Sequence, residues 1–332
     1  QPKENDTMQL VFHNPKFPNT DVSTPLSLYP AANVWDANWN MVGNPFLTYF
    51  DLDSFALSKF NYPVICWNGT GYDTYRPGDD TYHFLPLEGF FVQNAALTQM
   101  TFPAQGRETR IQAQKKTKGG ASSPAAIPSR YTQNKAQSTE RQLINLTLSD
   151  SSYTDRTRVV FNAASSIDYE LGVDATKFLA DAPSPVQIFS IGMHGEKYSI
   201  NERPLTAKGE TVRLGYYAPN AGLLTLSCTR MDTAICLYDN ELHCYVDLSE
   251  GDYTFYSAQG NHFTRFSILP KAQKPDITTS SDELSADERT DVSIFTLTGA
   301  VIVEHVNAAD LHLTPGAYLM RTDNGTKKII VR

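Results

Sequence analysis

Apolar and polar residues alternate with a period of two in short runs along the chain, and few stretches keep a helical period for more than two turns. Gly, Pro, Asn and Asp bound these runs, with turn signals about every 8 to 12 residues, a spacing typical of a sandwich or barrel. The pattern predicts short strands in the first third of the chain. They are expected at 9–13, 38–44, 63–68, 71–76, 89–94 and 99–104.

A second and clearer series of alternating runs begins with RQLINLTLSD (141–150) and continues to about residue 270. Its length and turn spacing predict about nine or ten strands arranged as a two-sheet β-sandwich. Within it, LGVDATKFL (171–179) is the one candidate for a short helix or an ordered loop.

Two polar stretches divide the chain. Residues 106–138 are rich in Gly, Ala, Pro and Lys and predict a linker, and residues 271–290 predict a polar tether. The expected fold is therefore all-β, with two β-sandwich modules of the jelly-roll or Ig-like kind at 1–105 and 139–270. A short C-terminal β-tail of four strands is expected at 291–332, too small to bury much surface by itself.

Composition narrows the class of protein. The 332 residues are 41% hydrophobic and 11% aromatic, which is enough for real cores, and the net charge of −8 argues against nucleic-acid binding. No apolar run approaches the roughly 20 residues of a membrane span. The chain starts at Gln1 without a methionine, so either a signal peptide has been removed or this is a piece of a longer protein.

Three of the four cysteines, Cys228, Cys236 and Cys244, are spaced eight residues apart, which is not a zinc-ligand spacing. In a β-meander the even spacing could bring two thiols together, so a Cys228–Cys236 or Cys236–Cys244 disulfide is one interpretation for an exported protein. The other interpretation is that they are small apolar residues that face a core, as is common for cysteine.

The last forty residues carry the most specific resemblance. The runs VSIFTLTGAVI (292–302), LHLTPGAYLMR (311–321) and KKIIVR (327–332) resemble the C-terminal sorting domain of cargo proteins of the type IX secretion system. The motif positions of that family are filled here by Gly299, Leu313, Gly316, Tyr318, Lys327, Lys328 and Arg332. The resemblance implies recognition by a secretion machine, followed by release or anchoring at the cell surface, although only a short piece of the usual Ig-like domain is present.

The two predicted modules also resemble a repeat of large surface proteins of the Gram-negative bacteria in which such sorting tails occur. The first pattern lies in WNMVGNPFLTYFDLD (39–53), WNGTGYDTYRPGDD (67–80) and LEGFFVQN (87–94), and the second in DRTRVVFN (155–162) with residues 171–177. These motifs imply a lineage and an export context, with an extracellular or outer cell-surface location. They do not imply an activity.

No catalytic motif competes with this interpretation. The sequence contains no GxSxG elbow, no HExxH and no P-loop, and its seven histidines are dispersed. A glycosidase needs only two carboxylates about 5 to 10 Å apart, which a sequence cannot display. Asp155 and Arg156 are interpreted as a buried charge pair that fixes a loop, with Asp168 and Asp174 as further candidate members of the pair's network.

Four aspartates in predicted loops, Asp51, Asp53, Asp79 and Asp80, are weak candidates for calcium ligands because carboxylate oxygens suit that ion. Capping of turns by aspartate explains the same pattern, and a calcium loop normally supplies more ligands. We therefore expect no cofactor, with calcium as the one alternative.

Aromatic residues are the only feature that suggests binding. Sugar rings present flat apolar C–H faces that stack on Trp and Tyr, whereas packing in a β-sandwich core explains aromatic residues equally well. The candidates for ligand binding are concentrated within fifty residues of the first module: Trp35, Trp39, Trp67, Tyr72, Tyr75 and Tyr82.

The sequence thus favours a non-catalytic extracellular module that serves adhesion or contact with a glycan or a host surface protein, with the secretion machinery as a further partner of the tail. The alternative is the accessory C-terminal region of a larger secreted enzyme, such as a glycosidase or peptidase. A glycosidase contained within these residues would need two carboxylates that converge in one cleft.

Overall fold

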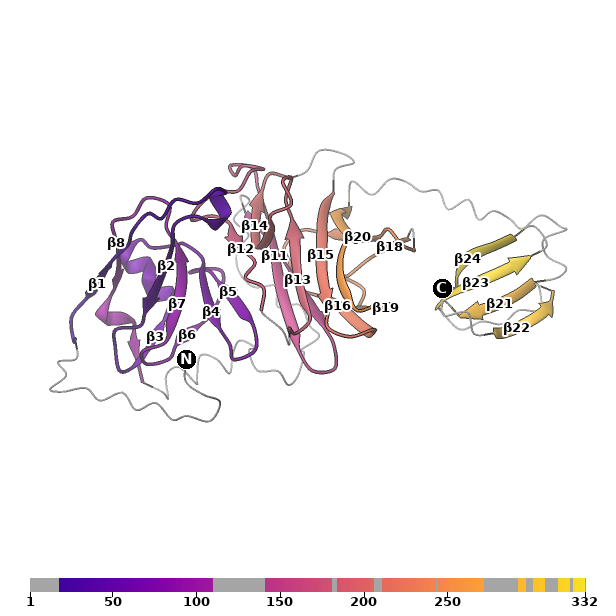
Figure 1. Ribbon diagram of the computed structural model, residues 1–332, viewed down its shortest axis with the longest axis horizontal. Helices are drawn as coiled ribbons and strands as arrows, with labels where there is room; N and C mark the ends of the chain where they lie inside the picture. The colour runs from indigo at the N-terminus through magenta and orange to yellow at the C-terminus, as the bar shows by residue number, and fades with distance from the viewer. Residues whose placement is uncertain are drawn as a thin grey trace. The chain divides into compact units, whose positions relative to one another are not determined.

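The structure is a computed structural model that divides into two compact units, residues 1–274 and 275–332, each considered by itself (Figure 1). Strands dominate both units, so the predicted all-β class is confirmed. The first predicted strand, at 9–13, lies outside the described residues, as do nearly all of the predicted linker and tether. The structure describes residues 18–109, 141–180, 184–205, 211–242, 244–271, 292–296, 301–307, 316–322 and 325–331.

The N-terminal part of the first unit contains three small antiparallel sheets. The largest has the order β2-β7-β4-β5, a second joins β6, β3 and β9, and the third pairs β1 with β8. The bounds are β1 Val22–Pro25, β2 Trp39–Gly43, β3 Tyr49–Asp51, β4 Val64–Trp67, β5 Tyr72–Tyr75, β6 His83–Phe84, β7 Gly89–Gln93, β8 Gln99–Phe102 and β9 Arg107–Glu108. Three short 3₁₀ helices accompany them: η1 Val34–Asp36, η2 Leu52–Ser58 and η3 Ala104–Gly106.

Phenylalanine rings fill the core of this part. Phe50, Phe55 and Phe102 are fully buried, and their ring centroids lie 4.8 to 5.3 Å apart. Gly106 is required at its position because a Cβ there would lie 2.5 Å from the Phe50 ring. Since side chains alternate across a strand, each strand of the β2-β7-β4-β5 sheet buries every second residue in this core and turns the others to the opposite face.

The C-terminal part of the first unit is a sheet of eleven described strands. Ten follow one hydrogen-bonded path, β18-β17-β20-β15-β13-β14-β11-β10-β16-β19, while β12 pairs with β14 at the side. All pairings are antiparallel except that of β11 with β14. The bounds are β10 Arg141–Ser149, β11 Thr154–Asn162, β12 Ala175–Thr176, β13 Gln187–Ile191, β14 Lys197–Arg203, β15 Val212–Ala218, β16 Gly222–Met231, β17 Ile235–Asp239, β18 Cys244–Val246, β19 Tyr253–Ser257 and β20 Gly260–Pro270.

This continuous path differs from the two separate sheets that the sequence predicted. The alternation was predicted well, since inward residues of nearly every strand meet in one apolar core. The predicted helix or ordered loop at 171–179 is a loop that contains only the short strand β12. None of the four cysteines forms a disulfide, so the Cys228–Cys236 and Cys236–Cys244 bridges are not present. Cys236 is buried and Cys228 packs against the core, which matches the apolar interpretation.

Arg265 connects strands near the two ends of this path. Its guanidinium donates to Asp239 of β17 at 3.2 Å and to the Tyr256 carbonyl of the edge strand β19 at 2.7 Å. It also lies over the Phe255 ring, 4.5 Å from the centroid, and the Tyr253 hydroxyl donates to Asp239 at 2.9 Å. Arg265 and Asp239 are both buried, so the nearly closed sheet has a charged seam.

The C-terminal unit is a four-stranded antiparallel sheet in the order β22-β21-β23-β24. Val292, Ile294 and Met320 form its small buried core. On the other side of the sheet, the Arg321 guanidinium lies 4.8 Å from the Phe295 ring centroid. The bounds are β21 Val292–Thr296, β22 Val301–Val306, β23 Gly316–Thr322 and β24 Gly325–Val331.

Replacing Arg265 by methionine tests the charged seam. The variant leaves Asp239 as a buried carboxylate without its guanidinium partner, so we expect the free energy of unfolding to fall by about 3 to 5 kcal/mol. Urea unfolding followed by circular dichroism measures this change. The double variant Arg265→Met with Asp239→Asn should recover part of the loss, and equal stabilities of the wild type and the single variant would contradict the assignment.

Candidate functional site

Two of the predicted binding aromatics belong to the rim of the N-terminal core. The rings of Tyr75 and Tyr82 are stacked with centroids 4.1 Å apart, and both pack against the buried phenylalanines. The Tyr82 hydroxyl donates to Glu88, and burial raises the pKa of Tyr82 far above its usual value. These contacts give both tyrosines a packing role.

Three of the remaining predicted aromatics, Trp39, Trp67 and Tyr72, lie on the opposite face of the same sheet, near Phe178. Trp39 meets the Phe178 ring edge-on at 4.6 Å, and Tyr72 does so at 5.4 Å. Trp67 packs against Tyr72 at 4.9 Å but keeps 49% of its surface exposed. Phe91 completes this aromatic strip, which we define as Trp39, Trp67, Tyr72, Phe91 and Phe178.

Trp35 lies beside the strip and contributes its backbone. Its carbonyl accepts hydrogen bonds from the Trp39 indole at 3.3 Å and from the Thr176 hydroxyl at 2.9 Å. The Trp35 side chain is half-buried, so Trp67 is the most exposed of the six predicted aromatics.

An ion pair fixes the loop that carries Phe178. The Lys177 ammonium donates to Asp155 at 2.6 Å, both side chains are almost fully buried, and the second oxygen of Asp155 accepts the Ile188 N–H at 2.7 Å. The predicted Asp155–Arg156 pair was therefore wrong in its partners. Neighbouring residues of a strand point to opposite faces, so Asp155 holds the loop through Lys177, whereas Arg156 points away from Asp155.

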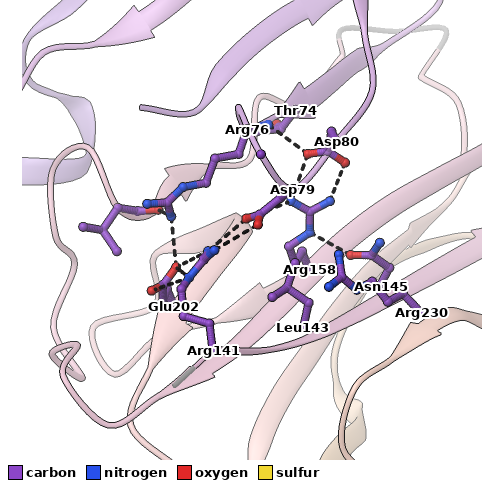
Figure 2. A network of polar contacts seen from close by, with 12 residues as sticks. Thr74, Arg76, Asp79, Asp80, Arg141, Leu143, Asn145, Arg158, Glu202 and Arg230 are labelled. Atoms are coloured by element: carbon purple, nitrogen blue, oxygen red, sulfur yellow. Dashed lines mark hydrogen bonds and ion pairs between the residues drawn. The ribbon is translucent and has the colours of Figure 1, made fainter. Parts of the chain in front are cut away.

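A second polar cluster, most of which is drawn in Figure 2, joins the N-terminal part to the eleven-stranded sheet. Arg156 belongs to it through its ion pair with Asp80. We call this cluster the charge clamp. On the N-terminal side it comprises the turn that follows β5, and on the other side it comprises residues of β10, β11 and β14. Its members are Arg76, Asp79, Asp80, Arg141, Arg156, Arg158 and Glu202.

Asp80 accepts hydrogen bonds from two arginines of β11. The buried Arg158 guanidinium donates to both of its oxygens, at 2.5 and 2.9 Å, and Arg156 adds a third bond at 3.1 Å. Asn145 fixes Arg158 from behind, with an Nε to Oδ1 distance of 2.7 Å. Burial by itself would raise the pKa of Asp80, but the two guanidinium groups outweigh it and lower the pKa below its usual value.

The other half of the clamp is centred on Glu202. Arg141 donates to both oxygens of Asp79 at 2.9 Å and to Glu202 at 2.7 Å, and Arg76 donates to Glu202 at 2.9 Å. Asn162 adds a bond of 2.7 Å to Glu202. Burial opposes ionisation of Glu202, yet these donors lower the pKa of its carboxyl overall.

The four weak candidates for calcium ligands all have protein donors. Asp51 accepts the N–H of Asp53 at the start of η2, and Asp53 accepts the N–H of Gly78 at 2.9 Å. Asp79 and Asp80 bind the clamp arginines. Among the residues that the structure describes, no group of three or more His, Cys, Asp or Glu side chains could hold a metal ion.

The residues of the resembled sorting motif fall in the C-terminal unit. Gly316 begins β23, which also contains Tyr318, and Lys327 and Lys328 belong to β24. Gly299 and Arg332 lie outside the described residues. No helix in the described part of the chain is long and apolar enough to cross a membrane.

The charge clamp is the feature that sequence reasoning missed. Its signal was visible in TDRTRVVFN, where Arg156 and Arg158 occupy alternate positions and therefore share one face of β11. Such a pair in an otherwise apolar strand indicates a buried partner for the arginines. The partner, PGDD at 77–80, is itself a turn motif, and its aspartates were interpreted as turn caps.

Fold and site together define an all-β protein in which two β-structured parts are joined by a buried charge clamp and an aromatic strip. The chain belongs to the DUF8693 family, a domain of unknown function, whose family model matches residues 58–269 and so spans both sides of the clamp. Searches of curated proteins and of solved structures gave no match.

The pH dependence of stability tests the carboxyl next to the clamp. Asp174 accepts the backbone N–H groups of Glu170 and Glu202, and burial raises its pKa from 3.8 to about 7. A folded-state pKa above the unfolded value means that the native state binds the proton more tightly. This carboxyl should therefore lower the free energy of unfolding by a few kcal/mol as the pH rises from 3.8 to about 7.

Asp80 and Glu202 act in the opposite sense. Because their pKa values are lowered in the folded state, they stabilise the fold at any pH above their pKa values in the unfolded chain, and this stabilisation is lost as the pH falls. Comparing the pH profiles of the wild type and Asp174→Asn isolates the Asp174 contribution, whatever the absolute stability of the variant. The free energy of unfolding of the variant should fall less between pH 4 and 7. Parallel profiles would contradict the assignment.

Proposed function

We propose that the protein is a non-catalytic binding module of the extracellular space or outer cell surface, which contacts a glycan or a protein surface through the aromatic strip. The exposed ring of Trp67, which packs against Tyr72 and through it reaches Phe178, is the observation that carries this proposal. Met41, which is paired with Phe91 across β2 and β7, exposes 73% of its surface and widens the apolar face.

A sugar ring suits such a surface. The apolar C–H face of a pyranose stacks on an indole, and a Trp exposed beside other aromatics provides area with little loss of conformational entropy. The hairpin tip next to Trp67 adds polar groups: Asn68 is exposed and donates to Asp73 and to the Tyr153 hydroxyl. Hydroxyl groups of a sugar could exchange with these hydrogen bonds.

The state of the carboxylates supports binding over hydrolysis. A glycosidase needs one carboxyl that gives up a proton and another that faces the substrate. In the clamp, Asp79, Asp80 and Glu202 are each bound by arginine, and lowered pKa values keep Asp80 and Glu202 ionised. Asp174, whose pKa is raised to about 7, is buried and holds two backbone N–H groups instead of facing the surface.

Export belongs to the same proposal. We propose that the C-terminal sheet, with Gly316, Tyr318 and the lysines of β24, is the part that a type IX secretion machinery recognises. We further propose that residues 18–109 and 141–271 correspond to the two modules that recur in surface proteins of this kind. The family match covers residues 58–109 of the first and nearly all of the second, which supports treating them as one functional unit.

A glycan-array screen tests the proposed function. The purified chain, with and without calcium, should bind a subset of glycans, and Trp67→Ala should lose that binding because it removes the exposed stacking surface. Tyr256→Ala is the matched control, since Tyr256 is 55% exposed on β19 and does not belong to the strip. A wild type that binds no glycan, or a Trp67→Ala variant that binds as the wild type does, would contradict a glycan-binding strip.

A further inference from the structure

The aromatic strip is assembled from both parts of the first unit. Trp67 and Tyr72 lie on the β4–β5 hairpin of the N-terminal part, and Phe91 lies on the neighbouring strand β7. Phe178 comes from the other part, from the loop that follows β12. The face therefore depends on how the two parts are held against each other.

Phe178 is rigidly attached to its own part. The backbone N–H of Lys177 donates to the Lys197 carbonyl of β14 at 2.8 Å, and the Lys177 side chain is anchored on Asp155. Any shift of β11 and β14 relative to the hairpin would thus carry Phe178 with it.

The charge clamp connects strand β5 of the hairpin with strand β11 of the eleven-stranded sheet. Strand β5, which carries Tyr72, runs directly into the turn that contains Asp80. Strand β11 begins beside Asp155 and carries Arg156 and Arg158. Between the clamp and the strip, the Thr74 hydroxyl donates to the Ser199 hydroxyl at 2.8 Å, and the Thr74 carbonyl accepts from Arg156 at 2.6 Å.

These contacts are directional. A guanidinium that binds both oxygens of a carboxylate fixes distance and angle together, and burial protects the bonds from competition by water. Arg158 has 1% of its side chain exposed and Asp80 has 5%. The apolar contacts around Phe178, in contrast, tolerate sliding.

We propose that Asp80, Arg156 and Arg158 are positioning residues for the aromatic strip. They fix the position of β5 relative to β11, which belongs to the other sheet, and this position places Phe178 against Trp39 and Tyr72. The ligand face is then a composite that exists only when the clamp is closed. This inference rests on the proposed function for its consequence in binding, but its structural part can be tested without a ligand.

Iodide quenching of Trp39 tests the structural part. In a background with Trp35→Phe and Trp67→Phe, Trp39 is the only tryptophan, and it packs on Phe178. Asp80→Asn should shift its emission to longer wavelength and increase its quenching by iodide, and Phe178→Ala should do the same. Asp247→Asn is the matched control, because Asp247 pairs with the exposed Lys271 at another edge of the sheet.

Arg156→Gln covers the case in which Asp80→Asn fails to fold. The Arg156 side chain is 30% exposed, and its loss leaves Asp80 bound by Arg158. We expect a smaller change of the same sign in Trp39 quenching. Folded Asp80→Asn and Arg156→Gln variants with the quenching of the control would overturn the proposal.

Binding supplies the second part of the test. With all three tryptophans present, Asp80→Asn should weaken binding to the tightest glycan of the array by about tenfold, the loss expected for one aromatic contact. If quenching rises but affinity is unchanged, the composite face is overturned. If the wild type binds no glycan, the proposed function fails, while the Trp39 measurement still decides whether the clamp positions Phe178.

Discussion

The arrangement of the first unit depends on one interaction, the binding of the buried Asp80 carboxylate by two arginines of β11, a strand far along the chain. Removing one partner of a buried ion pair is strongly destabilising, since it leaves an uncompensated charge. Replacing all partners by apolar residues is often neutral, so the net stability contributed by such a cluster is small. What the clamp contributes is a unique alignment of the two sheets, because each guanidinium meets its carboxylate in only one geometry.

The clamp and the aromatic strip make different contributions where the two parts of the first unit meet. Contacts between Phe178 and its neighbours remove apolar surface from water and supply non-directional attraction. The bonds of Arg141, Arg156 and Arg158 select one alignment among the many that such contacts would allow. Asp174, whose pKa is raised by burial, ties the loop before Phe178 to the backbone of the clamp residue Glu202.

The sequence predicted the local structure well and the pairing poorly. Period-two alternation placed strands at 63–68 and 89–94, close to the observed Val64–Trp67 and Gly89–Gln93. Alternation states which face of a strand is buried, but it carries no information on which strands are neighbours. The single path of the eleven-stranded sheet, with its parallel β11–β14 pair, could therefore not be predicted from the sequence.

The candidate site was predictable only in part, for a related reason. Trp39, Trp67 and Tyr72 were identified as aromatics of interest, but their central contact, Phe178, is more than a hundred positions away. Arg156 and Arg158 carry charge, and a local pattern cannot distinguish a charged face that meets water from one that meets another part of the protein. Burial of charge is decided by tertiary structure, and the sequence displays it only through alternation within an apolar strand.

The separation of the clamp partners along the chain has a consequence for the order of folding. Asp80 and Arg158 are 78 positions apart, and Trp35 and Thr176 are 141 apart. Closing such long loops costs conformational entropy before any contact is gained, which slows folding. The sheet face with Tyr72 and Thr74 must stay uncovered until β11 and β14 have formed. During that interval, an unpaired aspartate lies close to exposed aromatic rings, and the cost of removing its carboxylate from water disfavours association with the apolar surfaces of other chains there.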